Sequence, residues 1–225
     1  MTPMDLLPFA LLGGVLGLDV VSFPQAMVSR PLVAATLAGA LAGDAERGLV
    51  LGVVLEMVAL GTLPFGASRY PEWGSASVVG GALYATGTHG MSGQLAFGML
   101  AALITAWASG ESMDWLRKLN ARWARAARPL LEQGDGHSVA ALQMRGLTAD
   151  LARGSVVTLV ALAVLWPAFT VLSARWSGDA DTERTLLAGL TSALGGATIW
   201  MLVRGTTGSR LLILAGTAVG MVLIL

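Results

Sequence analysis

Eight apolar segments follow one another along the chain. A transmembrane helix needs about 20 apolar residues, and only the segments that begin at Ser155 and Leu186 approach that length. The segments are Met4–Leu18, Leu32–Ala42, Gly48–Leu63, Ser75–Thr88, Leu95–Ala108, Ser155–Leu172, Leu186–Val203 and Leu211–Leu225. Charged residues make up 12% of the 225 residues, against about 25% in soluble domains, which is too little polar surface for a water-soluble globule. The pattern therefore predicts an all-α, polytopic membrane protein.

Most of the N-terminal segments are short and interrupted by glycine, which is typical of broken or re-entrant helices around a site at the middle of the membrane. Ordinary tilted helices are the alternative. Four glycine pairs have the small-xxx-small spacing that lets helix backbones approach closely in lipid. They are Gly13/Gly17, Gly39/Gly43, Gly48/Gly52 and Gly216/Gly220. Because Asp5 precedes the first cation, Arg30, the leading segment lacks the basic start of a signal peptide and is expected to be a retained membrane element.

A charged stretch from Glu111 to Arg153 separates the fifth and sixth apolar segments. It is expected to form two helical arms, Ser112–Leu131 and Val139–Ala152, joined by a turn at Gly134-Asp135-Gly136. The first arm carries an apolar stripe on one face, which indicates packing or, alternatively, a docking surface. The stripe consists of Trp115, Leu116, Leu119, Trp123, Ala126 and Leu130.

The distribution of charge between the loops predicts the orientation of the chain. The excess of Lys and Arg in the charged stretch is typical of a cytoplasmic location, and the acidic loop Ser173–Arg184 is then expected on the opposite side of the membrane. The chain is thereby divided into three parts. They are an N-terminal membrane block (1–110), a cytoplasmic amphipathic helical hairpin (111–153) and a C-terminal membrane block (154–225).

Charged side chains within the apolar region point to a site. Glu56 lies in the middle of LVLGVVLEMVALGTL without an opposite charge nearby in sequence, and an unpaired carboxylate at bilayer depth costs about 2.5–3.5 kcal/mol on insertion scales. Arg30 precedes Pro31, as at a helix N-terminus. Asp44 follows Gly43 just after the apolar segment that Arg30-Pro31 opens, and the stretch from Arg69 to Trp73 is a polar, aromatic turn.

These groups have two interpretations. In the first, they form a hydrogen-bonding cage for a polyhydroxylated ligand, because carboxylates accept from hydroxyls, Arg and amides donate to them, and Trp or Tyr offers an apolar face. In the second, they form internal ion pairs, such as Glu56 with Arg30 or Arg69, that only hold helix ends together. Asp44 suits a turn or cap, while Asp19 suits either a helix cap or the site.

Several classes of function are excluded. The balance of 14 Lys and Arg against 14 Asp and Glu argues against a nucleic-acid partner. The chain has no Cys, hence no thiolate metal site and no Cys nucleophile. His89 and His137 have no second ligand at metal spacing, so neither a metal nor another cofactor is expected. No nucleotide-binding or hydrolase motif occurs, so the chain is not expected to be an enzyme.

The stretch SRPLVAATLAGALAGDAERGLVLGVVLEMVALG, from Ser29 to Gly61, closely resembles the core of the membrane IIC component of bacterial phosphotransferase systems of the mannose/fructose/sorbose class. The positions that match the family pattern are Arg30-Pro31, Gly43-Asp44, Gly48, Gly52, Glu56, Gly66-Ala67 and Pro71-Glu72. Asp19 and Gln25 match polar positions upstream. The strong resemblance covers about a quarter of the chain, and a weaker one extends into its C-terminal third.

This resemblance implies a multi-pass protein of the bacterial cytoplasmic (inner) membrane, with re-entrant hairpins and an elevator-like moving core. It implies a sugar permease subunit that binds a sugar, such as a hexose, in the membrane while a cytoplasmic IIB protein, supplied by IIA, phosphorylates it. A IID membrane subunit would share the sugar path in a higher oligomer. The residues implied to bind sugar are Glu56, Arg30, Asp19, Gln25, Asp44, Arg69 and Glu72.

The chain departs from the family pattern in some respects. It is shorter than typical members, and Glu72 stands where the family often has Asp. These departures leave the sugar undetermined and keep a non-transporting, regulatory IIC relative as the nearest alternative. An unrelated structural subunit, whose buried charges serve only helix packing, is a more distant one.

Overall fold

The computed structural model describes residues 3–62, 70–87, 93–175 and 180–203, together with 205, 208, 211 and 214–216. Its helices are α1 (Pro3–Asp19), α2 (Pro31–Ala42), α3 (Ala45–Leu60), α4 (Trp73–Ala85), α5 (Gly93–Glu132), α6 (Gly136–Arg175) and α7 (Ala180–Val203). Each of the first seven predicted apolar segments falls mainly on one of these helices, and the eighth, with its glycine pair, lies mostly outside the described residues. Over the described part of the chain, the all-α prediction is confirmed.

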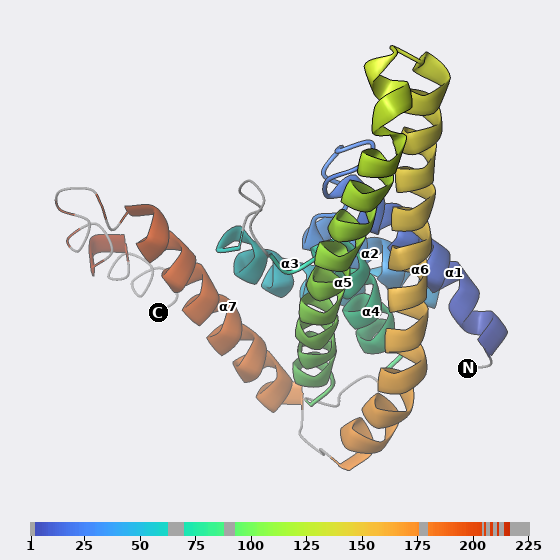
Figure 1. Ribbon diagram of the computed structural model, residues 1–225. Coiled ribbons are helices and arrows are strands. Elements are labelled where there is room, and N and C mark those ends of the chain that lie inside the picture. The colour runs from blue at the N-terminus through green and yellow to red at the C-terminus, as the bar shows by residue number, and fades with distance from the viewer. Residues whose placement is uncertain are drawn as a thin grey trace.

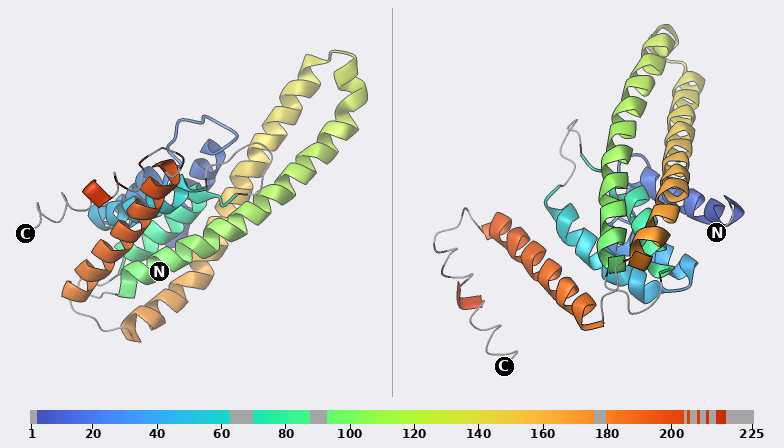
Figure 2. Two further views of the ribbon diagram at one scale, coloured as in Figure 1. Left: turned by 90° about the vertical axis from the view of Figure 1, so that its left-hand side faces the viewer. Right: turned by 90° about the horizontal axis from the view of Figure 1, so that it is seen from below.

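Helix α4 lies at the centre of the fold. All its residues are buried, and it contacts α1, α2, α3, α5 and α6 (Figure 1). Its apolar side chains belong to two hydrophobic clusters, one shared mainly with α1, α2 and α6 and the other with α3 and α5. Helix α7 lies apart from this bundle and contacts α3 and α5 (Figures 1 and 2). The short N-terminal helices thus surround a buried helix of 13 residues.

Glycines bring α2, α3 and α4 into backbone contact. A Cβ added at Gly39 of α2 would lie 2.7 Å from the Cα of Gly48 in α3, and one added at Gly81 of α4 would lie 2.9 Å from the Cα of Ala35. Such approaches leave no room for a side chain, so the predicted close packing is confirmed for Gly39 and Gly48. Gly43 differs, because it ends α2 as a left-handed C-cap with φ of 97°.

Helices α5 and α6 form a long antiparallel hairpin. Each has 40 residues, or about 60 Å at 1.5 Å per residue, and together they project beyond the other helices (Figures 1 and 2). Gly134, with φ of 76°, lies in the predicted turn. Asp135 then accepts the N–H groups of His137 and Ser138. The hydrogen bond from the Ser138 hydroxyl is the main reason why the pKa of the Asp135 carboxyl lies below its usual range.

Neither predicted arm forms a helix of its own. They continue without a break into the apolar segments on either side, so the boundaries at 110 and 153 fall inside α5 and α6, and the division into three blocks stays a prediction. The predicted stripe divides between two environments. Leu116 is buried whereas Trp115 is 73% exposed, because adjacent helical residues point about 100° apart. Trp123 contacts the other arm, where the guanidinium of Arg145 lies 4.1 Å from its ring centroid.

Among the described residues, two helices are long and apolar enough to cross a membrane: Gly93–Glu132 and Gly136–Ser173. Both present large apolar side chains outward, among them Leu100, Ile104 and Trp107 on α5, and Val156, Val160 and Val164 on α6. Outward apolar side chains at this density suit lipid or a membrane partner rather than water.

Candidate functional site

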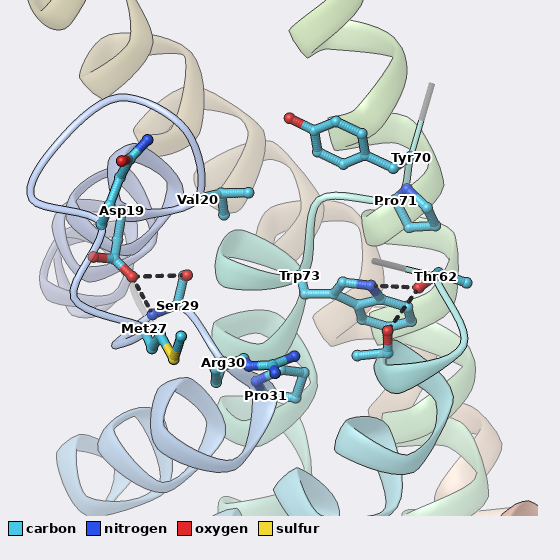
Figure 3. A pocket seen from close by; sticks show the side chains of 12 residues that line it. Asp19, Val20, Met27, Ser29, Arg30, Pro31, Thr62, Tyr70, Pro71 and Trp73 are labelled. Carbon is cyan, nitrogen blue, oxygen red and sulfur yellow. Dashed lines mark hydrogen bonds between the residues drawn. The ribbon is translucent and has the colours of Figure 1, made fainter. Parts of the chain in front are cut away.

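A cavity of about 270 Å³ opens between the loop that follows α1, the start of α2 and the connection from α3 to α4 (Figure 3). This volume is close to the lower end of the range of about 300–1,000 Å³ for small-molecule sites. We call it the central cavity. Its lining residues are Asp19, Val20, Gln25, Met27, Ser29, Arg30, Pro31, Ala59, Thr62, Tyr70, Pro71 and Trp73.

Asp19 organises the loop of residues 20–30, which forms one wall of the central cavity. Its carboxylate accepts the N–H of Ala26 at 2.6 Å, and the N–H and hydroxyl of Ser29 at 2.9 and 2.8 Å (Figure 3). The side chain is buried, and these bonds hold a loop in which Gln25 and Met27 have positive φ angles of 60° and 62°. Asp19 therefore shapes the wall, consistent with a place at the site rather than with a helix cap.

Arg30 and Glu56 form an ion pair beside the central cavity. Their closest atoms are 3.3 Å apart, and Glu56 also accepts the N–H of Leu32, in the first turn of α2, at 3.2 Å. Arg30 lines the central cavity, whereas Glu56 is not among its described lining residues. The ion-pair interpretation of Glu56 is thus what the geometry shows, and the carboxylate fixes a guanidinium at the edge of the cavity.

The opposite wall is aromatic. The indole N–H of Trp73 donates to Thr62 at 3.0 Å, which fixes the ring across the central cavity from Ser29 and Arg30 (Figure 3). Tyr70 is held by Arg117 of α5, whose guanidinium donates to the phenol oxygen at 2.7 Å and lies 5.0 Å from the ring centroid. These contacts give the cavity a rigid apolar face with a few polar groups around it.

Two other predicted site residues, Glu72 and Asp44, cap helices and are not among the described lining residues of the central cavity. Glu72 is fully buried and accepts the N–H groups of Gly74 and Ser75 at the start of α4, as well as the hydroxyl of Ser109 at 2.6 Å. Asp44 accepts the N–H of Arg47 at 3.0 Å as the N-cap of α3. Their geometry is that of N-caps, which satisfy free N–H groups at a helix start.

Gln25 lies in the lining, where its amide N–H donates to the carbonyl of Val21 at 2.9 Å. Arg69, the remaining predicted site residue, lies outside the described residues, as does His89. Within the part of the chain that the structure describes, no group of three His, Asp or Glu side chains could hold a metal ion.

Sequence reasoning did not assign Ser29, Met27 or Thr62 to the site, although all three line the central cavity. Ser29 directly precedes the Arg30-Pro31 pair, and Thr62 is the next-to-last residue of the apolar segment that contains Glu56. These positions at segment ends were the available signal. The sequence analysis considered Trp73 only as part of a polar, aromatic turn. In the structure, its indole is the largest aromatic ring that lines the central cavity.

Over the described residues, the fold is all-helical, with two helices long and apolar enough to cross a membrane and a central cavity lined by both polar and aromatic side chains. Residues 5–203 match the family described as the sorbose-specific IIC component of the phosphotransferase system. Since the match covers most of its length, the chain belongs to this family of membrane IIC components, as its sequence pattern predicted. Membership places the chain among the IIC components of phosphotransferase systems rather than among their IIA or IIB proteins.

Individual relatives agree with this family. The chain is 31% identical over 131 residues to the sorbose-specific EIIC component of Klebsiella pneumoniae, covering 58% of this chain and 48% of that protein. It is 26% identical over 137 residues to the fructose permease IIC component of Bacillus subtilis (strain 168), covering 60% and 49%. It is 28% identical to the mannose-specific EIIC component of Escherichia coli (strain K12), covering 60% and 50%. The matches thus span about half the length of these relatives.

Solved structures share the fold. One, described as a membrane protein, superposes with a TM-score of 0.73 at 20% sequence identity. The superposition covers 98% of this chain and 87% of the solved chain. A second, from the complex of the mannose transporter ManYZ with microcin E492, gives 0.63 at 18% identity and covers 97% and 87%. The arrangement of helices is therefore that of known membrane proteins.

Proposed function

We propose that this chain is the sugar-translocating IIC component of a phosphoenolpyruvate-dependent phosphotransferase system of the mannose/fructose/sorbose class. The observation that carries the proposal is the central cavity, which combines a fixed Trp73 indole with the guanidinium of Arg30 and the polar side chains of Ser29 and Thr62. A sugar needs both kinds of surface, because its ring carbons are apolar while its hydroxyls donate and accept hydrogen bonds.

In this mechanism the chain binds and orients the sugar but performs no phosphoryl chemistry. Arg30, held by Glu56, donates to sugar hydroxyls, and the hydroxyls of Ser29 and Thr62 exchange hydrogen bonds with them. Trp73 packs against the ring. Among the residues predicted from the family pattern, Arg30, Asp19 and Gln25 act at the cavity, and Glu56 acts through Arg30. Glu72 and Asp44 act through the helices that they cap.

The partners are those of the transport system. A IID membrane subunit shares the sugar path in a higher oligomer, and a cytoplasmic IIB protein, charged by IIA, phosphorylates the sugar. Support comes from the outward apolar side chains of α5 and α6, which suit a membrane neighbour, and from the similarity to a chain solved within ManYZ. The α5–α6 hairpin reaches into the cytoplasm, where it is suitably placed to contact IIB or IID.

The location follows from the same proposal. The chain crosses the bacterial inner membrane several times, with α5 and α6 as full spans. The shorter helices α2, α3 and α4 form re-entrant elements around the central cavity, because their 12, 16 and 13 residues fall short of the roughly 20 needed for a span. The named relatives act on sorbose, fructose or mannose, so these three sugars are the panel to test.

Reconstitution tests this function. Proteoliposomes that contain this chain and its IID partner, supplied with phosphoenolpyruvate, the general carrier proteins, IIA and IIB, are expected to accumulate the phosphate of one radiolabelled panel sugar. Accumulation should disappear when this chain is omitted. If the complete system assembles and IIB becomes phosphorylated, but no panel sugar is consumed, the transport role is contradicted and the regulatory alternative is favoured.

A further inference from the structure

A network of hydrogen bonds around a buried ion pair links α6 to both walls of the central cavity. At its middle, the guanidinium of Arg153 contacts the carboxylate of Asp150 at 2.9 Å. The two side chains are 8% and 2% exposed, and neither belongs to the described lining of the central cavity. A buried ion pair contributes little to stability compared with apolar packing, and its best-attested use is to specify one arrangement of the chain. The contacts of this pair therefore indicate which arrangement it specifies.

The first contact is with the loop of residues 20–30. The hydroxyl of Ser22 donates to the second carboxylate oxygen of Asp150, across 128 positions of the sequence. Asp19 organises the same loop from within, through Ala26 and Ser29. Through this hydrogen bond, Asp150 connects this wall of the central cavity to α6.

The second contact is with the start of α4. Arg153 donates to the hydroxyls of Ser109 and Ser112 of α5 at 3.0 and 3.1 Å. Ser109 in turn donates to Glu72 at 2.6 Å, and Glu72 caps the helix whose first residue is Trp73. The N–H of Glu72 also donates to Ala106 of α5 at 3.0 Å. The aromatic wall is therefore fixed to the same pair.

We propose that Asp150 and Arg153 are positioning residues for the sugar site, which hold the loop of residues 20–30 and the Trp73 end of α4 at the spacing that the sugar requires. This inference rests on the proposed function of the central cavity. The pair touches no sugar. It acts through Ser22 on one wall and through Ser109 and Glu72 on the other, so its loss weakens sugar binding by letting the walls move relative to each other.

The test measures the sugar Kd and the melting temperature of the full chain co-purified with its IID partner, with the panel sugar that binds the wild-type complex most tightly. Asp150→Asn and Arg153→Lys are each expected to raise Kd about 10-fold, the loss associated with one hydrogen bond to a charged group. The matched control is Arg47→Lys. Arg47 is equally buried and donates to Gly87 and Gln94 beyond the far end of α4, so its variant should melt lower without a change in Kd.

Ser22 provides a test that does not remove a buried charge. Ser22→Ala deletes one hydrogen bond at an exposed loop residue and is expected to raise Kd about 3-fold, whereas Ser22→Thr keeps the hydroxyl and should bind like the wild type. Unchanged Kd values in Asp150→Asn, Arg153→Lys and Ser22→Ala would overturn the positioning role while leaving the proposed function intact. If the folded wild-type complex binds none of the three sugars, the proposed function fails, and the positioning role fails with it.

Discussion

Replacing Glu56 by Gln is expected to lower sugar uptake about 10- to 100-fold, while the protein still inserts and assembles. Gln keeps an oxygen for the N–H of Leu32 but loses the charge that holds the guanidinium of Arg30 at 3.3 Å. Hydrogen bonds to charged groups contribute about 1.5–3 kcal/mol, which corresponds to this range in affinity. Uptake in proteoliposomes, normalised to the amount of assembled complex, is the measurement.

The matched control for this change is Glu46→Gln in the same helix. Glu46 is exposed in the first turn of α3 and lies outside the central cavity, so uptake should stay at the wild-type level. If Glu56→Gln protein is assembled and fully active, the assigned role of the Arg30–Glu56 pair is wrong. Restored stability in a double variant that lacks both charges, again without loss of uptake, would favour a purely structural pair.

Replacing Trp73 by Ala should weaken sugar binding by about 10- to 100-fold. The indole forms the apolar face of the central cavity, and covering a large apolar side chain contributes about 1.5–3 kcal/mol. Trp73→Phe keeps part of this face but loses the N–H that donates to Thr62, so its affinity should lie between those of Trp73→Ala and the wild type. Titration of sugar into the co-purified complex measures the three affinities.

Trp115→Ala is the control for a general effect of removing an indole. Trp115 is 73% exposed on the α5–α6 hairpin, away from the described lining of the central cavity, and its loss should leave the sugar affinity unchanged. Equal affinities for Trp73→Ala and the wild type would show that the sugar does not pack on this face.

Local signals in the sequence were sufficient for the helices and several of their ends. Arg30-Pro31 marks the start of α2, and Gly43-Asp44 marks the end of α2 and the start of α3, because these residue types satisfy free backbone groups or fix φ at helix termini. The joining of the charged arms to the neighbouring apolar segments was not predicted. A change from apolar to charged residues alters the surroundings of a helix without ending it, as in α5 and α6.

The roles of Glu56 and Glu72 depended on contacts between distant parts of the chain. The family pattern selected Glu56 and Glu72 together, but Glu56 pairs with Arg30 at the edge of the central cavity, and Glu72 bonds to Ser109 and the start of α4. Arg30, 26 positions from Glu56, was one of two cations that the sequence offered as its partner, whereas nothing in the spacing indicated Ser109, which lies 37 positions from Glu72. Thr62 likewise lines the central cavity beside Trp73, whose indole N–H donates to it across 11 positions of the sequence.

Protection of a single cysteine by sugar tests most directly whether the central cavity is the binding site. The chain contains no Cys, so Met27→Cys, on the loop that lines the cavity, and Met144→Cys, on the α5–α6 hairpin, each introduce one thiol. Met27 and Met144 are comparably exposed, at 69% and 61%. In the co-purified complex, saturating sugar is expected to slow maleimide labelling of Met27→Cys and to leave that of Met144→Cys unchanged. If Met27→Cys is labelled at the same rate with and without sugar, in a complex that transports this sugar, the central cavity is not the binding site.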